Sequence, residues 1–120
     1  MKLVAGLLTA LVALEHFGFM VLEMFFWRTP YAMKAFGTTP ATAETTAVLA
    51  ANIGLYNGFL AAGLVWSLIS QKKDVALFFL GCVLVAGLYG GATANPRIFM
   101  VQALPAALAI AATLLVSRKV

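Results

Sequence analysis

Three ionisable residues lie inside the first apolar run of the chain, and they constrain the fold more than any other feature. Residues 3–27 are otherwise almost wholly apolar, yet they include Glu15, His16 and Glu23. A run of this length can cross a bilayer as a helix. Ionisable groups at membrane depth are costly, and they usually face a bundle interior where they bind, relay protons or pair. The sequence therefore predicts an integral membrane protein with a polar interior.

Further uncharged runs follow the first. They cover residues 45–71, 75–96 and 98–117, and each is longer than the about 18 residues that indicate a membrane-spanning helix. Hydrophobic residues make up 63% of the 120-residue chain and charged residues only 10%, which is too little polar surface for a soluble domain. We expect one all-α domain over residues 1–120. It should be an antiparallel four-helix transmembrane bundle, with spans at about 3–27, 45–71, 75–93 and 97–117.

The basic side chains gather between the runs and predict the topology. With four spans, one side of the membrane would carry Lys2, Lys72, Lys73, Arg118 and Lys119, and the other Arg28, Lys34 and Arg97. Because cytoplasmic loops are enriched in Lys and Arg, this distribution favours cytoplasmic termini in a multi-pass membrane protein. The net charge of +4 indicates contact with the lipid bilayer and not a nucleic-acid-binding surface.

Helical periodicity places the polar residues of the first run on one face. At 100° per residue, His16 and Glu23 are about 20° apart around the helix, and Glu15 is about 80° from Glu23. The same stripe contains Thr9, Val12, Met20 and Trp27. At a rise of about 1.5 Å per residue, polar residues of the other runs share two depths with these groups. The outer layer would hold Glu23, Asn52, Tyr89 and Gln102, and the middle layer Glu15, His16, Tyr56 and Asn57.

Two polar layers predict a pocket that opens to the outer face and binds or transforms a small, partly polar molecule. Glu15, His16 and Glu23 are the candidate acid–base groups. The candidate ligand-binding residues are Asn52, Tyr56, Asn57, Tyr89 and Gln102. Apolar side chains available to wall the pocket are Phe19, Met20, Trp27, Phe59 and Trp66. The sequence names no cofactor, and it leaves open whether the protein is an enzyme.

Other interpretations stay open. One His and two carboxylates match the ligand types of a facial-triad iron site, although a second His is lacking. A small transporter is compatible with the sequence if it works as a homo-oligomer. A structural role is the fourth alternative, with the amides acting as interhelical hydrogen bonds. Small residues at helical spacing, at Gly54 and Gly58 and at Gly87 and Gly91, favour close packing within the chain.

The long connection, residues 28–44, is expected to contain a short amphipathic turn over 31–36 and a helix start near 40–43.

One extended motif resembles a known family. Leu14-Glu15-His16 and Leu22-Glu23-Met24-Phe25 are followed by Ala50-Ala51-Asn52 and by Gly54-Leu55-Tyr56-Asn57-Gly58-Phe59-Leu60-Ala61. This combination is similar to a family of small bacterial four-helix integral membrane proteins catalogued as domain of unknown function 1304. Position 53 is Ile where the family leads us to expect Gln. The resemblance implies the fold and a location in the bacterial inner membrane, and it implies no activity.

Overall fold

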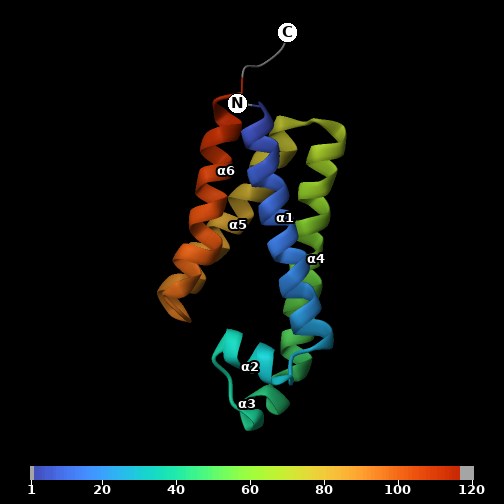
Figure 1. The fold of residues 1–120 in the computed structure, drawn as a ribbon, viewed down its shortest axis with the longest axis vertical. Coiled ribbons are helices and arrows are strands. Elements are labelled where there is room, and N and C mark those ends of the chain that lie inside the picture. Colours follow the sequence, from blue (N-terminus) through green and yellow to red (C-terminus); the bar gives the residue numbers. More distant parts are fainter. Residues whose placement is uncertain (1, 117–120) are drawn as a thin grey trace. The chain divides into compact units, whose positions relative to one another are not determined.

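The computed structural model describes residues 2–116, and these residues form helices without any β-strand. The order along the chain is α1 (Lys2–Phe25), α2 (Pro30–Phe36), α3 (Pro40–Thr45), α4 (Ala47–Ser70), α5 (Lys73–Thr93), the π-helix η1 (Phe99–Ala103) and α6 (Leu104–Leu114) (Figure 1). The all-α class is confirmed. The helix count differs from the expected four, because the long connection forms two short helices of its own.

Three helices are long and apolar enough to cross a membrane, namely α1, α4 and α5. The 24 residues of α1 and of α4 correspond to about 36 Å at a rise of about 1.5 Å per residue. The fourth apolar run is different, because its continuous apolar helix covers only Phe99–Leu114. The predicted end of that run at residue 117, and the basic residues Arg118 and Lys119, lie outside the described residues.

A proline explains why the fourth run is not one regular α-helix. Pro105 occupies the first turn of α6, directly after the π-helical residues of η1. Proline has no N–H, and its ring collides with the carbonyl four residues earlier in an α-helix. A π-helical turn widens the backbone at such a position. The prediction of one regular span over residues 97–117 does not allow for this proline.

The two short helices begin at threonine caps. The Thr29 hydroxyl accepts a hydrogen bond from the Ala32 amide at 3.3 Å, and Pro30 follows it as the first helical residue. Thr39 caps α3 in the same way, through the Thr42 amide at 3.2 Å. A helical turn over 31–36 and a helix start near 40–43 were both expected. The cap of α3 is Thr39, because a side-chain oxygen at N-cap reaches the amide three residues on.

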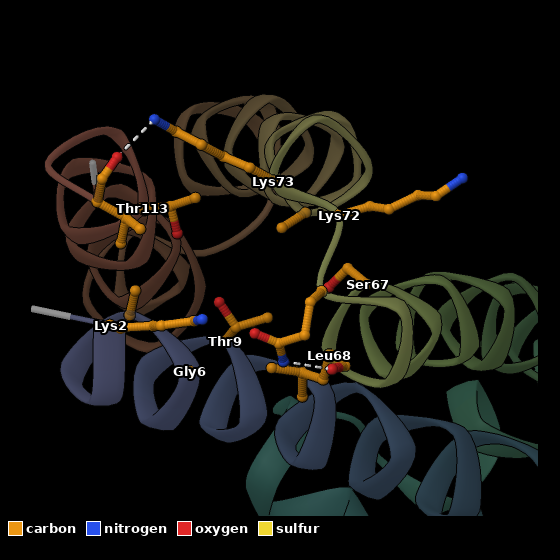
Figure 2. A pocket seen from close by; sticks show the side chains of 12 residues that line it. Lys2, Gly6, Thr9, Ser67, Leu68, Lys72, Lys73 and Thr113 are labelled. Atoms are coloured by element: carbon orange, nitrogen blue, oxygen red, sulfur yellow. Dashed lines mark hydrogen bonds between the residues drawn. The ribbon is translucent and has the colours of Figure 1, made fainter. Parts of the chain in front are cut away.

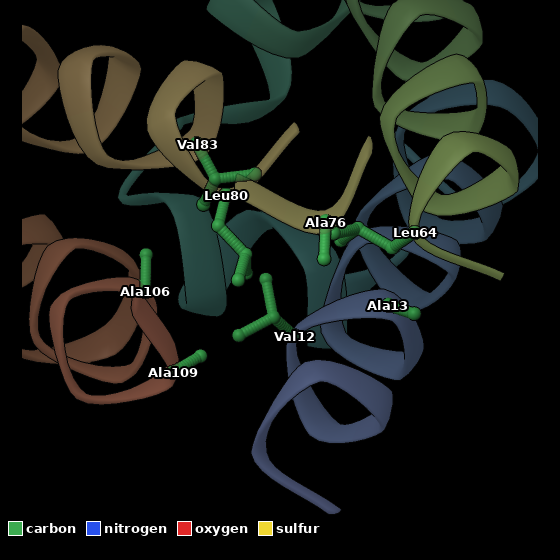
Figure 3. Close-up of a cluster of buried hydrophobic side chains, with 8 residues drawn as sticks. All are labelled: Val12, Ala13, Leu64, Ala76, Leu80, Val83, Ala106 and Ala109. Atoms are coloured by element: carbon green, nitrogen blue, oxygen red, sulfur yellow. The ribbon is translucent and has the colours of Figure 1, made fainter. Parts of the chain in front are cut away.

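The described residues divide into two compact units, one within Met1–Leu14 and Leu60–Val120, and the other Glu15–Phe59. The first unit contains a hydrophobic core around Val12, Leu64, Leu80 and Val83, each of them 0% exposed (Figure 3). Alanines from α5 and α6 complete it, namely Ala76, Ala106 and Ala109. Small side chains let helix backbones approach closely, which favours dispersion contacts between them.

Within the first unit, α5 and α6 run in opposite directions. Lys73 at the start of α5 contacts Val116 beyond the end of α6, and the Val83 carbonyl accepts a hydrogen bond from the Gln102 side chain at 3.1 Å. A Cβ atom at Gly87 would lie 2.9 Å from the Ala103 backbone nitrogen. The glycine spacing therefore serves contacts within the chain, as expected. A complete four-helix bundle stays a prediction.

In the second unit, α1 and α4 also approach through glycines. A Cβ atom at Gly54 would lie 2.8 Å from Met24 Cγ, and one at Gly58 would lie 2.6 Å from Met20 Sδ. Both glycines are buried. The buried face of α4 in this unit is thus its stripe of small residues.

Candidate functional site

The second unit contains a buried carboxylate that is hydrogen-bonded across two helices. Asn57 Nδ2 on α4 donates to Glu23 Oε1 on α1 at 2.6 Å. Glu23 is only 7% exposed. Gly54 permits this contact, because a Cβ atom at that position would lie 3.0 Å from Glu23 Cβ. The distance is shorter than the about 2.7–2.9 Å that is typical of charge-assisted N–H···O hydrogen bonds.

His16 and Glu15 lie further along α1 in the same unit. His16 is fully buried, and its ring packs edge-on against Phe19 with the centroids 5.1 Å apart. Glu15 is half-buried, and its Oε1 atom is buried without a hydrogen bond from the described residues. Thr9, Val12, His16 and Glu23 are all buried, in agreement with the predicted stripe. The inward face of α1 therefore carries the ionisable residues.

Two of the residues expected on the facing stripe of α4 point elsewhere. Tyr56 is 65% exposed, and its ring packs against Phe59 of the same helix. Asn52 is exposed and donates to the Val48 carbonyl one turn earlier, at 2.8 Å. The expectation that these two side chains face Glu15 and Glu23 is wrong, because the small residues occupy the inward face of α4.

Tyr89 and Gln102 belong to the first unit. Tyr89 is 72% exposed and borders a shallow apolar hollow along α5, together with Phe78 and Cys82. Gln102 is half-buried, and its amide is used for the contact with the Val83 carbonyl. The structure thus gives Gln102 a packing role between η1 and α5.

The facial-triad hypothesis finds no support in the part of the chain that the structure describes. Over residues 2–116, no group of three or more His, Cys, Asp and Glu side chains lies close enough together to hold a metal ion.

A cavity of about 120 Å³ lies in the first unit, and none of the predicted site residues lines it. It is formed where the start of α1, the end of α4, the start of α5 and the end of α6 come together (Figure 2). Its polar lining consists of Lys2, Thr9, Ser67, Gln71, Lys72, Lys73 and Thr113. The predicted pocket at Glu15 and His16 is not among the described cavities.

The hydroxyl groups of this cavity are buried. Thr9, Ser67 and Thr113 are 2%, 4% and 5% exposed. Ser67 Oγ donates to the Leu64 carbonyl at 2.6 Å, and Thr113 Oγ1 donates to the Ala109 carbonyl at 2.7 Å. The sequence-based interpretation assigns the lysines to topology only. One sequence feature could have indicated the cavity, namely that lysines occur together with serine or threonine near the ends of several helices.

These observations define a small all-helical protein with three helices suited to crossing a membrane. The sequence profile described as "Protein of unknown function (DUF1304)" matches residues 10–114, so the chain belongs to that family. It is also similar to "Uncharacterized protein YpaA" from Lactococcus lactis subsp. lactis (strain IL1403), with 34% identity over 107 residues that cover 85% of this chain and 89% of the relative. No solved structure matches the chain. The expected family is confirmed.

Proposed function

We propose that the protein is a multi-pass protein of the bacterial cell membrane that binds a small, partly polar molecule between α1 and α4. The membrane location is supported by three helices long and apolar enough to span. It is also supported by large hydrophobic side chains at the surface, such as Leu3 at 72%, Val48 at 77% and Ile69 at 79% exposure. Exposed apolar surface of this extent fits contact with lipid.

In this proposal the fourth pass is made by η1 and α6, which gives four antiparallel passes. Helical backbone is continuous over residues 97–114. These 18 residues correspond to at most about 27 Å at the α-helical rise of about 1.5 Å per residue, because the π-helical turn η1 rises less per residue. That length is close to the hydrocarbon thickness of about 30 Å. Both termini would then lie on the cytoplasmic side, as the distribution of basic residues favours.

The hydrogen bond between Glu23 and Asn57 is the observation that carries the ligand proposal. An acidic side chain at 7% exposure is costly inside a membrane unless it is well compensated. The contact in the structure is with a neutral amide, at 2.6 Å. Compensation by one amide is incomplete, because a carboxylate has about four acceptor positions. A ligand with hydrogen-bond donors would supply the rest.

The free atoms of the pair indicate the chemistry of this ligand. Once Asn57 Nδ2 donates to Glu23 Oε1, the unused atoms are chiefly acceptors, namely the second carboxylate oxygen and the amide oxygen. A molecule with hydroxyl or amino groups on an apolar body fits them. His16 and Glu15, in the same unit, are further polar groups for such a ligand or for proton exchange.

Native mass spectrometry of the detergent-purified protein tests the proposal. Wild type should carry a small-molecule adduct, and Asn57→Ala, Glu23→Gln and His16→Ala should lose it. Asn52→Ala is the matched control, because it removes an amide from the same helix that bonds only to its own backbone. Its adduct should equal that of wild type.

A structural role is the second candidate, since the same hydrogen bond also joins two helices. Loss of one partner should then lower stability by about 1–3 kcal/mol, because the other is left buried and unsatisfied. If wild type carries no adduct, while Asn57→Ala unfolds earlier than Asn52→Ala, the ligand proposal is refuted and the structural role is supported.

A further inference from the structure

The cavity of the first unit is large enough for a chemical group and not merely for water. Its volume is about 120 Å³, whereas one water molecule needs about 10–15 Å³ of such space. All of its lining residues belong to the first unit. The cavity is therefore a property of one compact part of the chain.

Its electrostatic character is positive. Lys2, Lys72 and Lys73 line it, and none of the described lining residues is acidic. The acidic neighbour in sequence, Asp74, is exposed and its carboxylate accepts a hydrogen bond from the Val75 amide at 3.0 Å. No carboxylate of the described lining therefore neutralises the lysines, and an anion is the complementary ligand.

The three lysines of the lining point in different directions. Figure 2 shows the Lys2 ammonium directed toward Thr9, whereas Lys73 extends to the end of α6, where its Nζ donates to the Val116 carbonyl at 2.9 Å. The Lys72 ammonium points away from the other lining residues. An ammonium group has three donors, so Lys73 keeps two. Ser67 and Thr113 already donate within their own helices. The donors for an anion are thus chiefly the ammonium groups, with the Thr9 hydroxyl beside them.

Gln71 is the remaining polar residue of the lining, and its side-chain amide donates to the Leu68 carbonyl at 2.6 Å. The other lining residues are apolar. Ala5, Leu68 and Ala76 contribute apolar surface. Gly6 also lines the cavity, and a Cβ atom at this position would meet nothing within 4 Å. An anion that continues into an apolar or glycerol-like part fits this combination better than a small inorganic ion does.

We propose that this cavity binds the phosphate group of an anionic phosphate ester, with Lys2 and Lys73 as its cationic contacts. Such a group comes either from the headgroup of an anionic phospholipid or from a soluble phosphate compound. The membrane location proposed above favours the lipid, because lysines at the cytoplasmic surface attract anionic headgroups. The site is independent of the ligand proposed at Glu23.

The test is a lipid titration of the detergent-solubilised protein, followed by native mass spectrometry. Phosphatidylglycerol is the anionic probe and phosphatidylcholine the zwitterionic one, and glycerol 3-phosphate represents the soluble source. Gly6→Leu places a side chain in the cavity. Gly18→Leu is its matched control, since Gly18 belongs to the same helix, does not line the cavity, and would also have nothing within 4 Å of an added Cβ atom.

Wild type and Gly18→Leu should retain phosphatidylglycerol in preference to phosphatidylcholine, and Gly6→Leu should lose that preference. Lys2→Gln should bind about tenfold more weakly, as for the loss of one charge-assisted hydrogen bond. Lys34→Gln, which removes an equal charge outside the lining, should not change binding. If glycerol 3-phosphate binds saturably, and Gly6→Leu and Lys2→Gln weaken this binding in the same way, the ligand of the same site is a soluble phosphate compound. Equal phosphatidylglycerol binding by wild type, Gly6→Leu and Lys2→Gln would overturn the proposal, whatever happens at Glu23.

Discussion

The contact between Gly87 of α5 and the backbone of η1 allows a sharp test of the packing in the first unit. A Cβ atom at Gly87 would lie 2.9 Å from the Ala103 nitrogen and 3.1 Å from both its Cα and Cβ atoms. Two of these neighbours are backbone atoms, so they cannot move aside as a flexible side chain can. Gly87→Ala therefore requires α5 and η1 to separate.

Gly81 provides the control on the same helix, because a Cβ atom there would meet nothing within 4 Å. Replacing a helical Gly with Ala stabilises by about 0.5–1 kcal/mol through backbone entropy. Both variants gain this contribution, and only Gly87→Ala has the overpacking cost of about 1–3 kcal/mol. The difference between the variants should therefore be about 1–3 kcal/mol, with Gly87→Ala the less stable.

Unfolding in mixed micelles, followed by circular dichroism, measures this difference. Gly81→Ala should unfold at or above the midpoint of wild type, and Gly87→Ala clearly below that of Gly81→Ala. Equal midpoints for the two variants would show that α5 and η1 do not approach as closely as described, and the reasoning would be refuted.

Two further predictions concern the backbone. Gln71 has φ 55° after the end of α4, a conformation that costs an L-residue about 1–2 kcal/mol. Gln71→Gly and Gln71→Ala both lose the side-chain hydrogen bond to the Leu68 carbonyl, so Gln71→Gly should unfold at a higher midpoint than Gln71→Ala. A midpoint for Gln71→Gly at or below that of Gln71→Ala would count against the left-handed cap. Pro105→Ala restores an amide donor at the start of α6, so η1 should convert to regular α-helix. Hydrogen-exchange mass spectrometry should then show a slowly exchanging amide at position 105. Rapid exchange of that amide would contradict the proposed effect of the proline on η1.

The inward face of α1 could be predicted because two independent rules agree on it. The 3.6-residue period groups His16 with Glu23, and the cost of exposing ionisable groups to lipid turns that stripe inward. Both residues are buried. Where helical periodicity and the cost of exposing ionisable groups to lipid indicate the same face, the sequence alone is sufficient to predict which face of the helix is buried.

The facing side of α4 could not be predicted on the same basis. A polar stripe predicts that its amides and tyrosine turn inward, whereas Gly54 and Gly58 are buried and Tyr56 is exposed. The inward face of such a helix is the one on which its backbone can approach a neighbouring helix closely, and small residues permit that approach. Asn57 is the one amide of this stripe that contacts Glu23 among the described residues.

Predicting the basic cavity requires knowledge of the tertiary structure, more than predicting the inward faces of α1 and α4 does. Its lining comes from three separate parts of the sequence, within residues 2–9, 67–76 and 113–116. Whether a lysine at a helix end turns toward its neighbours or toward solvent depends on the packing of those neighbours. The sequence shows the charges, but it does not show that Lys2 and Lys73 border one cavity.

The central claim is that ionisable residues of α1 lie within the bilayer. Carbodiimide labelling of the four acidic side chains in native membranes tests it most directly. Glu44 in α3 and Asp74 at the start of α5 are exposed, whereas Glu23 is buried within α1. A lipid-soluble carbodiimide should modify Glu23, and a water-soluble reagent added to opened membranes should modify Glu44 and Asp74 instead, as located by peptide mass spectrometry. Modification of Glu23 by the water-soluble reagent as readily as Glu44 would contradict the account.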